Sequence, residues 1–123
     1  MPTVEQGVRR LPSGRWWEAV RVPAYRARHV LTWLGSTSGA VLLHQDAEPI
    51  YTWLIRLGAA DMWDQATLGV MVPRPGTVIR VPPATWCGGP GTRWLVPTGP
   101  TGLTSPDRLR RALEQTPLGG TYA

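Results

Sequence analysis

Lysine and phenylalanine are both absent from this chain of 123 residues, and cysteine occurs once, as Cys87. A lone cysteine argues against a disulfide-stabilised scaffold, because no second thiol is present to pair with it. No apolar run approaches the roughly 20 residues of a membrane-spanning helix, so we expect no membrane partner. Residues 1–6 lack the basic-then-apolar pattern of a secretory signal, and we therefore expect a cytoplasmic protein.

The chain contains seven tryptophans. All of its 13 basic residues are arginine, and with eight acidic residues the formal net charge is +5. Two explanations of arginine without lysine remain open. The codon usage of a GC-rich genome favours arginine, and the 14 glycines and 13 prolines point the same way. Alternatively, guanidinium is selected for anion recognition, since its planar fork matches phosphate. Codon usage does not explain where in the chain the arginines lie. Their position is therefore better evidence for a function than their number.

The length fits one domain with a real hydrophobic core. Composition divides the chain into a flexible basic arm, a single domain and a loose tail, over residues 1–15, 16–117 and 118–123. We expect one short strand near Val8 inside the arm.

Residues 16–35 predict a helix, or a turn followed by a helix, with Pro23 at its first position and Gly35 just past its end. Apolar residues at three-to-four spacing predict its buried stripe: Ala24, Ala27, Val30, Leu31 and Leu34. Arginines occupy another face of this helix, which predicts a basic outer surface: Arg21, Arg26 and Arg28.

Short apolar or β-branched runs predict strands over 39–43, 50–57, 68–72, 78–81 and 94–96, and a single helical turn within 59–67. The polar segment 44–49 is typical of a hairpin connection, and the segment 73–76 of a turn between two strands. In the second strand, alternation predicts which side chains face the core: Tyr51, Trp53, Ile55 and Leu57.

A last helix is predicted after Ser105, which can cap it, with Pro106 at its first position and an end before Pro117. Its apolar stripe is Leu109, Ala112 and Leu113. Acids lie within helical reach of its arginines and are expected to neutralise them in part: Asp107 and Glu114 with Arg110 and Arg111. Together the elements predict an α+β fold, with a mainly antiparallel sheet of four to five short strands and two flanking helices.

Two pairs of acidic residues are candidates for a catalytic or metal-binding site. Asp46 and Glu48 have the spacing that places two carboxylates on one side of a strand, as a two-metal site requires. Pro49 follows them directly, so we favour a solvated hairpin turn. Asp61 and Asp64 are spaced for one helical face, where we favour surface placement or helix capping.

Other catalytic or metal constellations are weaker. His29 lies among arginines, His44 is distant from it, and Cys87 has no base arranged beside it in sequence. The chain has no lysine to complete a phosphate-binding P-loop. We therefore expect no metal, no cofactor and no enzymatic activity.

The tryptophans divide into two groups. Trp33, Trp53 and Trp63 occur in apolar patterns and are predicted to be core. The others lie next to arginine or in glycine- and proline-rich loops: Trp16, Trp17, Trp86 and Trp94. Two interpretations of this second group stay open, because such rings either pack over the sheet and fasten irregular loops, or stack on bases of a single-stranded nucleic acid.

Several segments between Gly39 and Trp94 match a known pattern. A glycine turn, Ser38-Gly39-Ala40, precedes Tyr51-Thr52-Trp53-Leu54-Ile55. A strand ending in a double proline follows, Pro75-Gly76-Thr77-Val78-Ile79-Arg80-Val81-Pro82-Pro83-Ala84, and then Gly91-Thr92-Arg93-Trp94. In this order the segments resemble the C-terminal half of the bifunctional DNA primase/polymerase (prim-pol) domain, over rather less than half of the chain.

This sequence departs from that family's pattern at its catalytic positions. Upstream of Gly39, where the metal-binding acidic pair is expected, only Glu5 and Glu18 occur. Val41 stands where the active-site histidine should follow the glycine turn, and residues 70–74 contain no acid. The resemblance therefore implies an antiparallel sheet, a nucleic-acid context and a truncated, catalytically inactive relative.

Two functional hypotheses follow. The first is a non-catalytic protein that binds nucleic acid through an arginine-rich arm and first helix, with these candidate residues: Arg9, Arg10, Arg15, Trp16, Arg21, Arg26, Arg28, Arg80 and Arg93. The alternative is a protein-interaction module or regulatory subunit, dimeric through a tryptophan-rich surface, since Trp, Tyr and Arg are enriched at interface hot spots.

Overall fold

The computed structural model describes residues 9–15, 17–44, 48–82, 92–96 and 103–116. In chain order its elements are β1 (Arg9–Pro12), β2 (Glu18–Pro23), α1 (Ala24–Leu34), the 3-10 turn η2 (Gly35–Thr37), β3 (Val41–His44), β4 (Ile50–Ile55), α2 (Gln65–Leu68), β5 (Val78–Val81), β6 (Arg93–Val96) and α3 (Pro106–Glu114).

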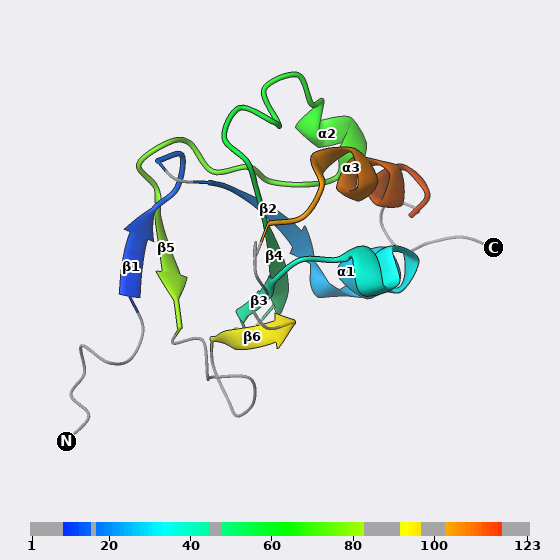
Figure 1. The fold of residues 1–123 in the computed structure, drawn as a ribbon, viewed down its shortest axis with the longest axis horizontal. Coiled ribbons are helices and arrows are strands. Elements are labelled where there is room, and N and C mark those ends of the chain that lie inside the picture. The colour runs from blue at the N-terminus through cyan, green and yellow to red at the C-terminus, as the bar shows by residue number, and fades with distance from the viewer. Residues whose placement is uncertain (1–8, 16, 45–47, 83–91, 97–102, 117–123) are drawn as a thin grey trace.

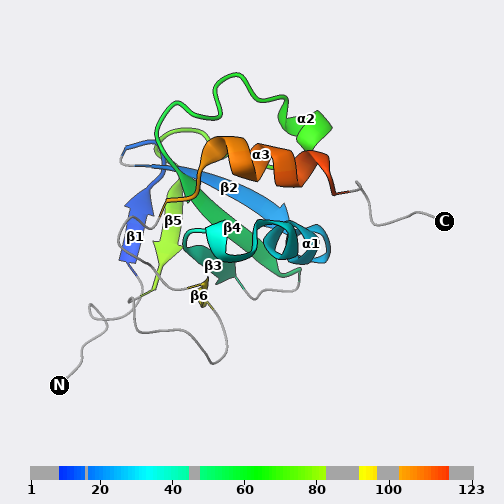
Figure 2. The same cartoon turned by 45° about the vertical axis from the view of Figure 1, so that its right-hand side comes forward.

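The strands form two antiparallel sheets, which confirms the predicted α+β class. Four strands form the larger sheet in the order β2-β4-β3-β6, and β1 pairs with β5 in a separate two-stranded ribbon. In Figure 1 and Figure 2 the ribbon lies at one end of the molecule, away from α1.

Strand β4 lies inside the larger sheet and is buried on both faces. Tyr51, Trp53 and Ile55 face the main core, where the helices α1 and α3 pack against the sheet. This confirms three of the four core positions predicted for this strand. Leu57 lies beyond the end of β4 and is 44% exposed, so its predicted core position is wrong.

The opposite face of the sheet carries a second, smaller core. Leu54 of β4 packs there with Leu42 and Trp94, and Ile79 of the ribbon belongs to the same cluster. The ribbon therefore covers part of the face that the helices leave open. Because both faces are covered, Thr52 and Leu54 are as well buried as their neighbours in sequence.

Residues 18–23 form strand β2, and neither the helix nor the turn that was predicted for them. β2 pairs along its whole length with β4, and Val20 and Val22 point into the main core. Pro23 ends this strand and stands at the N-cap of α1, and Gly35 at the C-cap has φ +55°. The predicted stripe of α1 is confirmed, since four of its members are buried and Leu31 packs against the core: Ala24, Ala27, Val30 and Leu34.

The predicted flexible arm differs from the structure over residues 9–15. Arg9–Pro12 is strand β1, and Ser13, which follows it, is only 1% exposed and donates a hydrogen bond to the Arg74 carbonyl. Gly76 donates its amide to the Ser13 carbonyl at 2.7 Å. Pairing with β5, 66 to 72 residues away in the chain, is therefore what orders this segment.

Residues 68–72 are not the strand that their apolar run predicts. Asp64 caps the short helix α2 by accepting from the Thr67 amide, and Gly69 ends it with φ +69°. Within this run only Met71 forms a bridge, to Arg21 at the edge of β2. The last two strands and α3 agree with prediction: Ser105 accepts from the Arg108 amide, and Leu109, Ala112 and Leu113 are buried.

Candidate nucleic-acid interface

Arg26 is not on the surface, although the sequence places it on the basic face of a helix. It is 2% exposed. Its Nη1 donates to the carbonyl oxygens of Leu68 and Gly69, both at 2.8 Å. Its Nη2 donates to the carbonyl oxygens of Leu113 and Thr116, at 3.3 and 3.2 Å. A residue with these partners does not contact nucleic acid.

The partners of Arg26 lie at the C-terminal ends of α2 and α3. Carbonyl groups there have no partner within their own helix, and the helix dipole places negative charge on them. Burial lowers the pKa of Arg26 from its ordinary value. The four carbonyl oxygens compensate the buried cation, so Arg26 joins α1 to both other helices.

Arg21 and Arg28 do not join the ribbon either. Arg21 is half-buried on β2, with its backbone bridged to Met71. Arg28 is exposed on α1, where it borders a cavity of about 400 Å³ together with Tyr25 and Glu48. Helix α1 lies away from β1 and β5 in Figure 1, so the early arginines do not form one face.

The ribbon brings together arginines that are far apart in sequence. Arg10 of β1 stands directly opposite Arg80 of β5, and both side chains are exposed. Arg9 stands opposite Val81 in the next register position. Since Ile79 on the alternate positions of β5 faces the second core, the face that carries Arg10 and Arg80 is turned outward.

The end of the ribbon adds two more exposed arginines, Arg15 and Arg74. Their turns lie side by side, because Ser13 exchanges hydrogen bonds with Arg74 and Gly76. Sequence reasoning missed Arg74, which lies in a proline-rich turn without other signal. Arg74 also borders a cavity of about 290 Å³ with Glu18 and Asp61, so acids lie near this end.

The two segments that form the ribbon and its turn carry charge of one sign only. Residues 9–15 and 74–81 contain five arginines and no acid: Arg9, Arg10, Arg15, Arg74 and Arg80. We call this set the ribbon arginines. Four of them were candidates from the sequence, and it is the pairing of β1 with β5 that gathers them.

The remaining candidates lie elsewhere. Arg93 is half-buried on β6, opposite Leu43 of β3. Trp16 lies outside the described residues. On α3 the arginines Arg110 and Arg111 are exposed, and within the described part of the chain no ion pair joins them to Asp107 or Glu114, so their partial neutralisation by these acids stays a prediction.

The tryptophans next to arginine follow the packing interpretation wherever the structure describes them. Trp94 is 3% exposed and donates from Nε1 to the Pro82 carbonyl, and Trp17 packs against the second core. Trp86 lies outside the described residues. Of the predicted core rings, Trp53 is buried and Trp63 packs against the core, but Trp33 is 51% exposed on α1.

Among the described residues, the candidate catalytic groups do not come together. Glu48 is exposed beside the hairpin between β3 and β4, and Asp46 and Cys87 lie outside the described residues. His44 is buried on β3 with its Nδ1 3.4 Å from the Thr92 hydroxyl, and His29 is exposed on α1. Over the described ranges, no three potential metal ligands cluster.

None of the helices in the described part of the chain could cross a bilayer; α1, for example, has 11 residues. No protein-family model, curated protein or solved structure matches this chain. The resemblance to the prim-pol domain therefore stays a prediction from the residues themselves.

Proposed function

We propose that this protein is a non-catalytic nucleic-acid-binding protein whose contact surface is the outward face of the β1–β5 ribbon. One observation carries the proposal: Arg10 and Arg80 are exposed and directly opposite each other on paired strands. Two arginines side by side on one exposed face make a local concentration of positive charge. A polyanion that lies along the ribbon is attracted to both.

The form of the surface favours a duplex. A two-stranded antiparallel ribbon has dimensions that enter the major groove of B-form DNA, and guanidinium groups pair with phosphate oxygens in a bidentate way. Trp94 is buried in the second core, and Trp17 is half-buried against it, so neither stands out as a free stacking platform. The proposed contacts are therefore to the phosphate backbone.

The test is a fluorescence anisotropy titration of a labelled 20-base-pair DNA duplex at several salt concentrations. Each phosphate that an arginine neutralises contributes about 0.9 to the slope of log K against log salt concentration. We expect the double variant Arg10→Gln/Arg80→Gln to weaken binding and to reduce this slope by about 2.

A matched control carries the same loss of charge at another place. The double variant Arg108→Gln/Arg110→Gln removes two exposed arginines from α3. We expect its affinity and slope to stay close to those of the unchanged protein. Equal losses in both variants would show attraction by net charge alone, and absence of binding at low salt would reject the proposal.

A second candidate function is association with another protein through α1. Trp33 and Tyr25 are 51% and 53% exposed on this helix, eight residues apart, with exposed Arg28 between them. These are the residue types that dominate interface hot spots. The interaction surface would thus be α1 and not the sheet, whose rings Trp53 and Trp94 are buried.

Light scattering after size-exclusion chromatography tests this candidate for self-association. A dimer that Trp33→Ala converts to a monomer would support it. A monomer at all concentrations, together with tight and salt-dependent duplex binding, would favour the ribbon as the functional surface.

A further inference from the structure

Arg21 is half-buried on β2, and its Nε is shielded from solvent. Its side chain makes no hydrogen bond or ion pair within the part of the chain that the structure describes, and its Nε is buried. Only the backbone of Arg21 is engaged, with Met71, through hydrogen bonds of 2.9 and 3.0 Å. A donor that is shielded from water and has no partner costs free energy, so an acceptor beside the Nε would be favourable.

A second unsatisfied group lies directly beside it. Thr52 of β4 is the register partner of Arg21, so both side chains are on the second face of the sheet. Thr52 is completely buried, and its Oγ1 has no hydrogen-bond partner among the described residues. Buried polar atoms are almost always satisfied, and two unsatisfied neighbours on facing strands indicate a missing acceptor.

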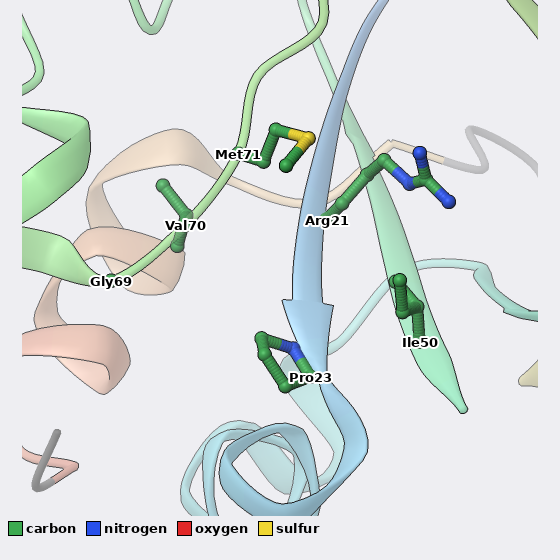
Figure 3. Close-up of a pocket in the computed structure, with 6 residues that line it drawn as sticks. All are labelled: Arg21, Pro23, Ile50, Gly69, Val70 and Met71. Atoms are coloured by element: carbon green, nitrogen blue, oxygen red, sulfur yellow. The ribbon is translucent and has the colours of Figure 1, made fainter. Parts of the chain in front are cut away.

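An apolar cavity of about 250 Å³ borders Arg21, the more exposed member of this pair. It is lined by Arg21 itself, Pro23, Ile50, Gly69, Val70 and Met71. Pro23 and Ile50 are register partners on the same sheet face as Arg21 and Thr52, one step further along the strands. Figure 3 shows the Arg21 guanidinium directed away from Met71 and Val70, over β4 and on the side where Ile50 lies.

We propose that Arg21 and Thr52 bind the headgroup of a small carboxylate whose apolar body occupies this cavity. The Nε–H of Arg21 and the hydroxyl of Thr52 are two adjacent donors, matching the two oxygens of a carboxylate. The apolar walls match a hydrocarbon body. Typical ligand pockets have volumes of roughly 300–1,000 Å³, so this smaller cavity fits a small molecule.

Access to the donors requires the Arg21 side chain to move, because its Nε and the Thr52 hydroxyl are both covered. That movement breaks no hydrogen bond to a described residue, since the guanidinium makes none. The side chain is thus a cover that lifts from Thr52 and then closes on the carboxylate. This site is separate from the ribbon arginines and does not depend on the proposed nucleic-acid function.

The test uses the full ¹⁵N-labelled chain and sodium hexanoate as the probe. We expect hexanoate to shift the Arg21 Nε–H signal and the amide signals of Ile50 and Thr52. Hexan-1-ol has the same apolar body without the charge, and inorganic phosphate has an oxyanion without the body, so neither should reproduce these shifts at equal concentration. Phosphate binding without hexanoate binding would reject the carboxylate assignment.

Two variants and a control locate the site. Arg21→Gln should raise the dissociation constant for hexanoate by about tenfold, as for the loss of one charge-assisted hydrogen bond. The isosteric Thr52→Val should also weaken binding, while its melting temperature stays equal or rises because an unsatisfied hydroxyl is removed. Arg56→Gln, an exposed site just past β4, should bind as the unchanged protein does.

Binding that Arg21→Gln leaves unchanged would overturn the proposal, and so would the absence of any shift with hexanoate. A fall in the melting temperature of Thr52→Val with hexanoate affinity unchanged would assign that hydroxyl a purely structural role and would equally overturn it.

Discussion

Arg26 on α1 donates a hydrogen bond of 2.8 Å to the carbonyl oxygen of Leu68, the last residue of α2. The same guanidinium reaches the Leu113 carbonyl near the end of α3. One buried side chain thus satisfies carbonyl groups from two helices at once, which explains how a helix of four residues stays docked on the core.

Replacing Arg26 with methionine should destabilise the fold by about 2–4 kcal/mol, because the carbonyl groups at both helix ends lose a charged donor. Urea unfolding followed by tryptophan fluorescence measures this. The exposed neighbour on the same helix provides the control: Arg28→Met should change the free energy of unfolding by less than about 0.5 kcal/mol. Equal effects of the two variants would contradict the assigned role.

Replacing Trp53 should be far more harmful than replacing Trp33. Trp53 is fully buried and donates from Nε1 to the Ser38 hydroxyl at 3.1 Å, whereas Trp33 is half exposed. We expect Trp53→Ala to cost about 3–5 kcal/mol and Trp33→Ala less than about 1 kcal/mol. The same urea experiment applies, and a comparable loss in both would show that α1 packs differently.

Asp64 should titrate below the ordinary range for aspartate. Hydrogen bonds from the Thr67 hydroxyl and amide lower the pKa of the Asp64 carboxyl, the side-chain bond being the larger cause. The carboxylate therefore stabilises the start of α2 fully above the unfolded pKa of about 3.9, and this contribution is lost as pH falls through the lower folded value. An NMR titration of the carboxyl carbon measures it. Thr67→Val should move the midpoint upward, and an unmoved midpoint would refute the cause.

Arg10→Glu should separate stability from binding. It replaces a like-charged pair across the ribbon by an opposite-charged one, since Arg10 faces Arg80. Thermal unfolding at low salt should show a gain of about 0.2–1 kcal/mol. Duplex affinity should fall at the same time. A variant that loses stability and keeps its affinity would be incompatible with the ribbon as the contact surface.

Gly39→Ala should be costly although its backbone is not strained. A Cβ there would lie 2.7 Å from the backbone of Leu103, so the segment before α3 would have to shift. We expect a loss of about 1–3 kcal/mol, as for overpacking in a core. At Gly35 no atom lies within 4 Å of an added Cβ, but φ +55° with ψ −132° is a conformation that L residues rarely adopt, so the alanine variant should lose about 1–3 kcal/mol through backbone strain alone. Urea unfolding measures both losses, and an unchanged stability of Gly39→Ala would contradict the close contact with Leu103.

Local sequence signals predicted those helices and strands whose ends are marked by capping residues or prolines. Ser105 and Pro106 set the start of α3, and the double proline at 82–83 ends β5 where its β-branched run stops. The strand β2 was missed because Val20 and Val22 alternate over too few residues to distinguish a strand from the helix that follows. Its pairing with β4, more than 25 residues away, decides the conformation.

In the candidate site, too, the sequence predicted some residues correctly and misplaced others. Sequence supplied the ribbon arginines except Arg74, but it also supplied Arg26, whose helical position resembled that of an exposed residue. Arg26 is buried because its partners are carbonyl groups 42 to 90 residues further along the chain. No local pattern contains that information.

By itself the sequence determined the α+β class, the caps of the last helix and a basic surface made of arginine, since these depend on residue type and short-range spacing. Only the tertiary structure decided which arginines act together. Antiparallel pairing of β1 with β5 places Arg10 against Arg80, while packing of α1 on α2 and α3 turns Arg26 inward. Both outcomes follow from contacts between distant segments, where burial and hydrogen bonding override the local pattern.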